Sequence, residues 1–262
     1  MKFVWTALLL CLSAAAQPPI VRYVLAPMPG MRRAELAVAE HPRPVAVLVL
    51  APGSNGDGAG MVSDIGWLTF AEDQRLMLVG LSFASDAAAL RDGTGYYYAS
   101  KGSGKLLLDT LDRLAGKPLP VLLYGFSGGA HFTARFAEWK PSRVAAWCAY
   151  SAGWWDVPAP SAPRPFGIVA CGESDERLGA SLFYFKAGRA AGRPWLWVGL
   201  PGSAHAEDAR VAAFAREAFA AVLEGTRGPD KHKGRLATEH TEHAERTGMG
   251  RGGWVDIEDI TV

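Results

Sequence analysis

Cysteine is scarce in this sequence, and neither sign of charge is in excess. Three cysteines among 262 residues are too few for a disulfide-rich scaffold or a four-cysteine zinc site. The chain has 27 lysine and arginine residues against 26 aspartate and glutamate residues, which argues against a nucleic-acid-binding protein driven by bulk charge. Apolar residues make up 49% and charged residues 20%, so a wholly disordered chain is also excluded.

The apolar stretch near the start is too short to span a bilayer, which takes about 20 residues. It follows a positive charge at Lys2 and leads to Ala14-Ala15-Ala16. This pattern predicts a cleaved signal peptide over residues 1–16, with Gln17 as the mature N-terminus. We therefore expect a secreted or periplasmic protein with no stable membrane span after cleavage; an uncleaved N-terminal anchor helix is the alternative.

The C-terminal end differs from the middle of the chain. Apolar periodicity stops after Glu224, and we expect residues 225–262 to form a polar tail that is partly disordered, because it cannot easily bury a core. Residues 254–262 alternate well enough to be a strand or a docking segment. No metal site is predicted, because the three tail histidines match no zinc-binding spacing. These histidines are His232, His240 and His243.

Between these ends, strand-like and helix-like patterns alternate. The continuous apolar run at residues 45–50, rich in β-branched residues, is typical of a strand buried on both faces of a parallel sheet. Residues 17–224 are therefore expected to form one α/β domain, a mostly parallel eight-stranded sheet with helices on both faces. The first two strands are expected to form an antiparallel hairpin. The other strands are predicted at 20–26, 31–38, 76–83, 121–126, 144–151, 166–171 and 195–198.

One motif has a definite chemical meaning. Gly125-Phe126-Ser127-Gly128-Gly129 is the only G-x-S-x-G sequence in the chain, and it lies between a predicted strand and a predicted helix. This context is typical of a nucleophile elbow, a strained turn whose glycines let the strand and the helix approach closely. Ser127 would then present its hydroxyl at a helix N-terminus, where the dipole favours developing negative charge. A simple glycine-rich β–α turn is the alternative.

A serine nucleophile needs a base, and the base needs an acid that orients it. His205, in the loop after the last core strand, is the preferred base, whereas His131 is expected to pack on the helix that follows the elbow. Asp175 follows the penultimate core strand, which gives the chain order serine, acid, histidine expected with this elbow. Three other acids remain possible at this stage: Glu173, Glu176 and Asp156.

Two backbone N–H groups are expected to form an oxyanion hole. One belongs to Gly128, directly after the nucleophile, and the other to Ser54 in the glycine-rich loop after the strand at 45–50. Other interpretations of the glycine-rich segments fail, because the chain contains no G-x-x-x-x-G-K-[ST] and no H-E-x-x-H. No G-x-G-x-x-G follows the first core strand in dinucleotide-binding form either.

With these residues in place, the chain from about 20 to 224 resembles the α/β-hydrolase superfamily. Its nearest likeness is to compact secreted esterases of the polyhydroxybutyrate-depolymerase, feruloyl-esterase and dienelactone-hydrolase type. The resemblance implies a triad that works without a cofactor, in which Ser127 attacks, His205 moves the proton and Asp175 orients His205. Many relatives have His-Gly where this chain has Pro52-Gly53, and the spacing after Ser127 leaves no room for a large cap domain. The motifs that carry the resemblance are Gly125–Gly129, Pro52-Gly53-Ser54, Gly172–Asp175 and His205.

Aromatic residues gather in the segments expected to border the site. Trp154 and Trp155 follow the strand at 144–151, which itself contains Trp147, and Tyr97 lies in a glycine-flanked loop. Such a wall suits acyl, aryl or sugar groups, and ordinary core packing is the alternative.

Cys148 and Cys171 fall on predicted strands that we expect to be neighbours. We expect them to be buried free thiols, with an export-compatible disulfide as the alternative.

Together these features predict a serine hydrolase, and most directly a carboxylic ester hydrolase with an acyl-enzyme intermediate. Its substrate would be a small-molecule or polymeric ester, and no nucleic-acid partner is expected. A serine peptidase or amidase with the same residues is an alternative, as is a catalytically silent hydrolase fold that only binds ligands. The sequence makes no prediction about oligomeric state.

Overall fold

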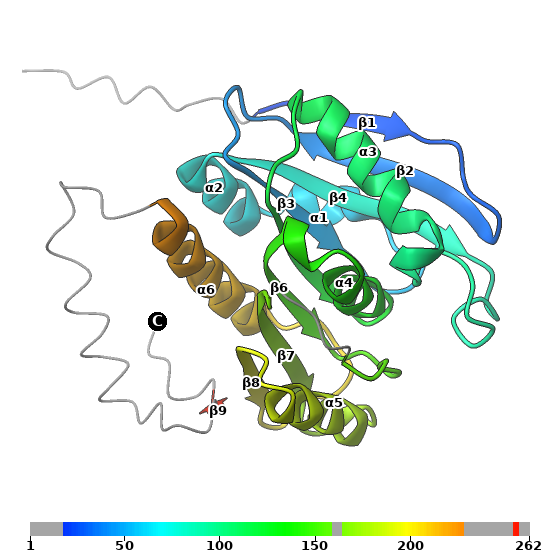
Figure 1. Ribbon diagram of the computed structural model, residues 1–262, viewed down its shortest axis with the longest axis vertical. Coiled ribbons are helices and arrows are strands. Elements are labelled where there is room, and N and C mark those ends of the chain that lie inside the picture. The colour runs from blue at the N-terminus through cyan, green and yellow to red at the C-terminus, as the bar shows by residue number, and fades with distance from the viewer. Residues whose placement is uncertain (1–17, 159–163, 228–253, 257–262) are drawn as a thin grey trace, which may run out of the picture.

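The computed structural model describes residues 18–158, 164–227 and 254–256. The predicted signal peptide and most of the predicted polar tail, including its histidines, lie outside these residues. A single sheet crosses the described part of the chain, with helices on both of its faces (Figure 1). Strand order across the sheet is β1-β2-β4-β3-β5-β6-β7-β8-β9.

Strands β1 to β8 confirm the mostly parallel eight-stranded sheet that the sequence predicts. β2 is antiparallel to both β1 and β4, so the predicted hairpin is present, and from β4 to β8 in the sheet order the strands are parallel to one another. The bounds are β1 Ile20–Val24, β2 Met31–Ala39, β3 Ala46–Ala51, β4 Leu76–Ser85, β5 Val121–Phe126, β6 Val144–Tyr150, β7 Phe166–Gly172 and β8 Trp195–Leu200.

A ninth strand, β9 (Trp254–Asp256), pairs in parallel with the edge strand β8. The alternating C-terminal segment therefore contributes a short strand, one of the two alternatives that its sequence leaves open. The last helix also continues to Arg227, past the boundary expected at Glu224.

Six α-helices connect the described strands. The last four follow β4, β5, β7 and β8, and the first two both lie between β3 and β4. Both start at an aspartate whose side chain accepts a backbone N–H, Asp57 from Ala59 and Asp64 from Trp67, which is the signal that could have located them. The helices are α1 Gly58–Val62, α2 Ile65–Gln74, α3 Ser103–Ala115, α4 Gly128–Trp139, α5 Leu178–Ala190 and α6 Ala209–Arg227.

The sheet separates two hydrophobic layers. Helices α3, α4 and α5 cover one face, and α1, α2 and α6 cover the other (Figure 1). Trp147, which sequence proximity groups with Trp154 and Trp155, is buried in the first layer and packs edge-on against Trp195. It is therefore a core residue and no part of a substrate-facing wall.

Side chains along a strand alternate between the two faces of the sheet, and this alternation separates the two described cysteines. Cys148 and Cys171 are buried free thiols, as expected. They lie in different hydrophobic layers, on opposite faces of the sheet, so no disulfide can join them.

The parallel strands bring five loops to one edge of the sheet. β3, β5, β6, β7 and β8 are consecutive neighbours that run in the same direction, so the loops after their carboxyl ends meet there. No large cap domain interrupts the described residues, which leaves this edge uncovered by a second domain. Within the same residues, no helix combines the length and the hydropathy needed to cross a membrane.

Candidate active site

Ser127 occupies a strained turn between β5 and α4. Its backbone has φ 50° and ψ −111°, a conformation that few non-glycine residues adopt, and its N–H donates to the carbonyl oxygen of Tyr150 over 2.8 Å. A Cβ at Gly125 would clash with the backbone of Gly129, and one at Gly129 would clash with that of Ala51. Only glycines allow this approach of helix and strand, so the turn has the geometry that the G-x-S-x-G motif predicts.

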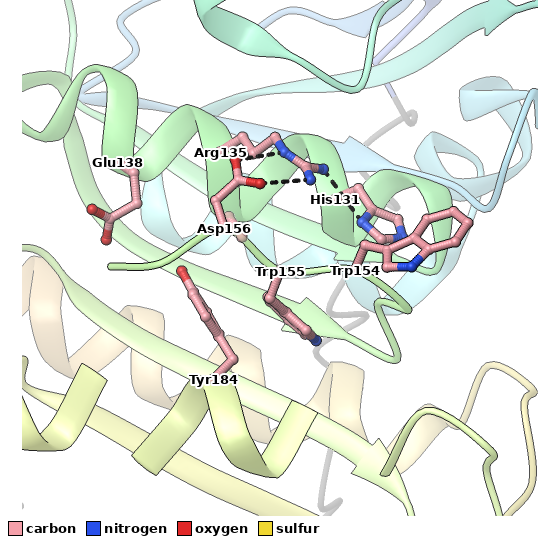
Figure 2. A pocket seen from close by; sticks show the side chains of 8 residues that line it. His131, Arg135, Glu138, Trp154, Trp155, Asp156 and Tyr184 are labelled. Atoms are coloured by element: carbon pink, nitrogen blue, oxygen red, sulfur yellow. Dashed lines mark hydrogen bonds and ion pairs between the residues drawn. The ribbon is translucent and has the colours of Figure 1, made fainter. Parts of the chain in front are cut away.

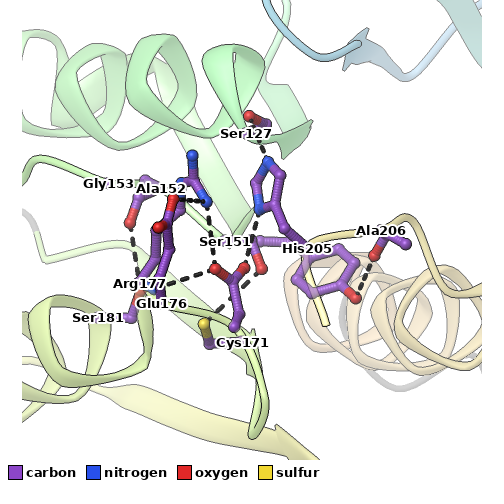
Figure 3. Close-up of polar contacts among 12 residues, drawn as sticks. Ser127, Ser151, Ala152, Gly153, Cys171, Glu176, Arg177, Ser181, His205 and Ala206 are labelled. Atoms are coloured by element: carbon purple, nitrogen blue, oxygen red, sulfur yellow. Dashed lines mark hydrogen bonds and ion pairs between the residues drawn. The ribbon is translucent and has the colours of Figure 1, made fainter. Parts of the chain in front are cut away.

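A chain of hydrogen bonds links Ser127 to a buried carboxylate through His205 (Figure 3). The Ser127 hydroxyl and His205 Nε2 are 2.9 Å apart, and His205 Nδ1 lies 2.8 Å from Asp175 Oδ2. Because an ionised carboxylate only accepts hydrogen bonds, Nδ1 carries the proton and Nε2 is left to accept from the serine. The imidazole is therefore placed to take the serine proton.

The environment of Asp175 keeps it ionised although its side chain has no solvent exposure. Burial by itself would raise its pKa, but donors to the carboxylate outweigh this effect and hold the pKa below its ordinary value. The backbone N–H of Arg177 donates to Oδ1 over 3.0 Å, and the side chains of His205, Ser151 and Arg177 also donate. A negative charge is thus available to stabilise a protonated imidazole.

The other acids that the sequence leaves open do not contact the imidazole. Asp156 forms a bidentate ion pair with Arg135, with distances of 2.8 Å and 2.9 Å. Glu173 and Glu176 are exposed. Among the described residues, Asp175 is the acid that lies within hydrogen-bond distance of this histidine.

The loop that carries His205 is held from beneath by strand β6. The Tyr150 hydroxyl donates to the carbonyl oxygen of Ala206 over 2.6 Å. The ring of Phe126, one residue before the nucleophile, stacks on the imidazole at a centroid distance of 5.0 Å. The first contact holds the backbone next to His205, and the second restricts the orientation of its ring.

The two predicted oxyanion-hole residues lie against each other. A Cβ built on Gly128 would lie 2.7 Å from the backbone nitrogen of Ser54, so the loop after β3 and the start of α4 touch at this point. The Gly56 N–H donates to the Gly53 carbonyl oxygen over 2.9 Å and closes a tight turn around Ser54. The two residues are thus in contact, and both line the cleft that contains Ser127.

An open cleft of about 400 Å³ leads from solvent to Ser127. It contains polar and apolar groups, and Trp154, with 59% of its surface exposed, is its large aromatic side chain. Arg177, which the sequence did not suggest, also lines it; its place two residues after Asp175 was the available signal. The lining residues are Ser54, Leu90, Ser127, Gly128, His131, Gly153, Trp154, Glu176, Arg177 and Ala180.

Of the three aromatic residues expected to face substrate, only Trp154 lines this cleft. Trp155 stacks on Tyr184 at a centroid distance of 4.3 Å and borders a much smaller neighbouring pocket, as Figure 2 shows. Tyr97 is buried, and its hydroxyl lies 3.3 Å from that of Ser54. Tyr97 therefore supports the loop after β3 and does not form a wall of the cleft.

His131 packs on α4, as expected, and it also borders the cleft. The Gly153 N–H donates to its Nε2 over 3.1 Å, and Arg135 Nη1 lies 3.4 Å from its Nδ1. Burial, helped by the neighbouring Arg135 guanidinium, lowers the pKa of His131 to about 3. A neutral imidazole thus ties α4 to the loop that presents Trp154, whose indole lies next to the imidazole in Figure 2.

Metal-ligating side chains do not converge in the part of the chain that the structure describes. No group of three or more histidine, cysteine, aspartate or glutamate residues there is arranged to hold a metal ion. The chemistry of the described site is that of a serine, an imidazole, a carboxylate and backbone N–H groups.

No protein-family model matches the sequence, and no curated protein is similar to it. Solved structures of esterases and serine hydrolases, in contrast, resemble its fold. A ferulic acid esterase aligns with TM-score 0.60 and 14% identity over 81% of this chain and 99% of its own. The ferulic acid esterase of the anaerobic fungus Anaeromyces mucronatus aligns with TM-score 0.58 and 14% identity over 78% and 90% of the two chains. A fluorophosphonate-binding serine hydrolase of Staphylococcus aureus aligns with TM-score 0.54 and 15% identity over 78% and 99%.

Proposed function

The chain has the α/β-hydrolase fold, and from the geometry of its site we propose that it is a serine hydrolase that cleaves carboxylic esters. The observation that carries this proposal is the hydrogen-bond chain from the strained Ser127 through His205 to the buried Asp175. An open cleft ends at the serine hydroxyl, so a substrate can reach it. Serine, base and orienting acid are the groups that covalent acyl transfer requires.

In the first half of the reaction, the Ser127 oxygen attacks the ester carbonyl carbon while His205 Nε2 takes the serine proton. The tetrahedral intermediate collapses, the carbon–oxygen bond to the alcohol breaks, and His205 returns the proton to the leaving alkoxide. In the second half, His205 activates a water molecule that attacks the acyl-enzyme. The carboxylic acid leaves and the serine hydroxyl is restored, with no net gain or loss of protons on the enzyme.

Three features stabilise the charges that develop in these steps. Asp175 keeps the imidazole in the tautomer that accepts the serine proton, and its negative charge stabilises the imidazolium. The N–H groups of Gly128 and Ser54 donate to the oxyanion, a type of donor worth about 10²–10³ in kcat. The α4 dipole adds positive potential at the same place.

The cleft supports a substrate with a flat or aromatic group next to the ester. Trp154 offers an exposed indole, and about 400 Å³ accommodates a small ester or the end of a polymeric one. Two structures with this fold are named ferulic acid esterases, and another is named an arylesterase. We therefore expect aryl and aromatic-acyl esters to be better substrates than aliphatic esters of the same size.

Two measurements on the purified protein test the proposal. A fluorophosphonate probe should label the wild type and leave Ser127→Ala unlabelled. Hydrolysis of p-nitrophenyl acetate should then be compared with that of p-nitroacetanilide, in which an N–H group replaces the bridging ester oxygen. We expect rapid ester cleavage and little amide cleavage.

Ser63→Ala is the control, because the Ser63 hydroxyl donates to the carbonyl oxygen of Ala59 and does not line the cleft. It should keep its labelling. Equal labelling of Ser127→Ala and the wild type would refute the nucleophile assignment, and preferential cleavage of the anilide would make the protein an amidase. Absence of both labelling and turnover would leave a fold that only binds ligands.

Export is a second part of the proposal and depends on the first 16 residues alone. Expression of the full chain in a bacterium should yield periplasmic or secreted protein whose N-terminal sequence begins at Gln17. An intact Met1 in the membrane fraction would favour the anchor-helix alternative.

A further inference from the structure

Arg33 makes contacts that no step of the proposed mechanism uses. It lies on β2, far in sequence from the nucleophile, at a bulge in the pairing with β4. Its Nη2 donates to the carbonyl oxygens of Asn55 and Gly56 over 2.9 Å and 2.6 Å, and its Nε donates to that of Ser82 over 3.1 Å. A part-buried guanidinium with no carboxylate within ion-pair distance, among the described residues, is thus held by three backbone carbonyl groups.

The two loop carbonyls belong to the turn that contains Ser54. In that turn the Gly56 N–H donates to the Gly53 carbonyl oxygen over 2.9 Å. The carbonyl and the N–H of a trans peptide point in opposite directions. Because the Gly53 carbonyl points into the turn, the Ser54 N–H of the same peptide must point outward, on the side where Gly128 approaches.

The turn needs an external restraint because its backbone is unusual. Asn55 has φ 59°, in the left-handed region that costs free energy for a residue with a side chain. Its side-chain oxygen accepts the Ser85 N–H over 2.9 Å, which anchors one side of the turn to β4. Arg33 anchors the other side, at the carbonyls of Asn55 and Gly56.

We propose that Arg33 is a positioning residue for the oxyanion hole, which acts by fixing the turn that aims the Ser54 N–H at the substrate oxygen. The proposal depends on the serine hydrolase function inferred above. A planar fork of N–H donors suits this task, because one guanidinium can reach three carbonyl groups in fixed directions. Lysine can satisfy only part of the same set.

A positioning role predicts a loss in kcat with little change in KM, because the oxyanion forms in the transition state and is absent from the bound ester. A displacement of about 1 Å in a catalytic group can cost about 10²-fold in rate. We expect Arg33→Met to lower kcat by about 10²-fold, and Arg33→Lys to lower it by less. The phosphonylation rate with a fluorophosphonate should fall in parallel, because its phosphoryl oxygen occupies the same hole.

Arg32 provides the matched control. It is the adjacent residue, and its guanidinium also donates two hydrogen bonds to one carbonyl, that of Ser85, but it does not contact the turn. Arg32→Met should keep kcat within about twofold of the wild type, as expected for a surface side chain. Adding guanidinium chloride at millimolar concentration should restore part of the kcat of Arg33→Ala and leave that of Arg32→Ala unchanged.

The kinetic constants of the two Met variants, with their thermal unfolding midpoints, decide the question. A lower kcat in Arg33→Met than in Arg32→Met at similar KM supports the proposal. Equal kcat in the two variants, or a loss carried by KM alone, overturns it. If Arg33→Met is too unstable to purify, Arg33→Lys is compared with Arg32→Lys by the same criteria. Failure of the underlying function would show separately, as a wild type without labelling that depends on Ser127.

Discussion

The His205 ring and the Asp175 carboxylate meet over 2.8 Å, on loops that follow adjacent strands. The carboxylate side chain is fully buried, whereas the side chain of the histidine is 30% exposed. Solvent therefore reaches the imidazole but not the carboxylate. Backbone and side-chain donors hold the pKa of Asp175 below its ordinary value. The charge of the acid is therefore maintained where water cannot screen it.

Replacing this carboxylate tests its role directly. Asp175→Asn keeps the size of the side chain but removes the charge and allows the wrong imidazole tautomer. The loss in kcat for a p-nitrophenyl ester should be about 10³–10⁴-fold. Asp156→Asn is the control, because that carboxylate pairs with Arg135 and not with the imidazole, and it should stay close to wild type. The opposite pattern would identify Asp156 as the acid.

Gly128→Ala should damage the oxyanion hole without touching the triad side chains. The added methyl would lie 2.5 Å to 2.7 Å from three atoms of Ser54, including its backbone nitrogen, so the loop after β3 must move. We expect kcat to fall by about 10²–10³-fold, the cost of losing one donor. Gly179→Ala on α5, where a Cβ meets no atom within 4 Å, is the control and should be active. Full activity in Gly128→Ala would show that the two loops do not form the hole.

Trp154→Ala should change selectivity more than turnover. Its exposed indole lines the cleft, so its loss should raise KM for aryl esters by about tenfold, which corresponds to about 1.4 kcal/mol of binding free energy. KM for aliphatic esters should change less. Phe183→Ala removes another exposed aromatic ring, on α5, that does not line the cleft. The same change in KM for both ester classes, or for both variants, would argue against a substrate contact.

The lowered pKa of His131 should make the free energy of unfolding decrease at acidic pH. Its pKa is about 3 in the folded protein, below the ordinary value of 6.5. Between these values the unfolded chain binds a proton that the folded protein does not, so stability falls as the pH falls from 6.5 toward 3. The slope from this group is about 1.4 kcal/mol per pH unit.

His131→Gln should remove this part of the dependence, because an amide oxygen can still accept the Gly153 N–H but does not titrate. Urea unfolding of both proteins at pH 7.5, 6 and 5 measures it: the stability difference should shift in favour of the variant as the pH falls. His41→Gln, at a histidine that does not line the cleft, should retain the wild-type decline. Parallel pH curves for wild type and His131→Gln would contradict the prediction.

Much of the candidate site could be predicted because its residues follow strands. Ser127 comes directly after β5, and Asp175 and His205 lie in the loops that follow β7 and β8. In a parallel sheet the carboxyl ends of neighbouring strands share one edge. The glycines around Ser127 marked the tight turn by their spacing alone. Apolar periodicity and the positions of turn-forming glycines are local properties of the chain. The sequence by itself therefore determined the strands of the sheet, the turn at Ser127 and the order of the site residues along the chain.

Only the tertiary structure decided which way side chains on irregular loops point. Trp154 and Trp155 are adjacent, yet one lines the cleft and the other stacks on Tyr184, because no period governs a loop outside a helix or strand. Among the four candidate acids, it also placed Asp175 within hydrogen-bond distance of His205. Arg33 reaches the turn around Ser54 through the β2–β4 pairing and its bulge, a long-range register that local patterns do not encode.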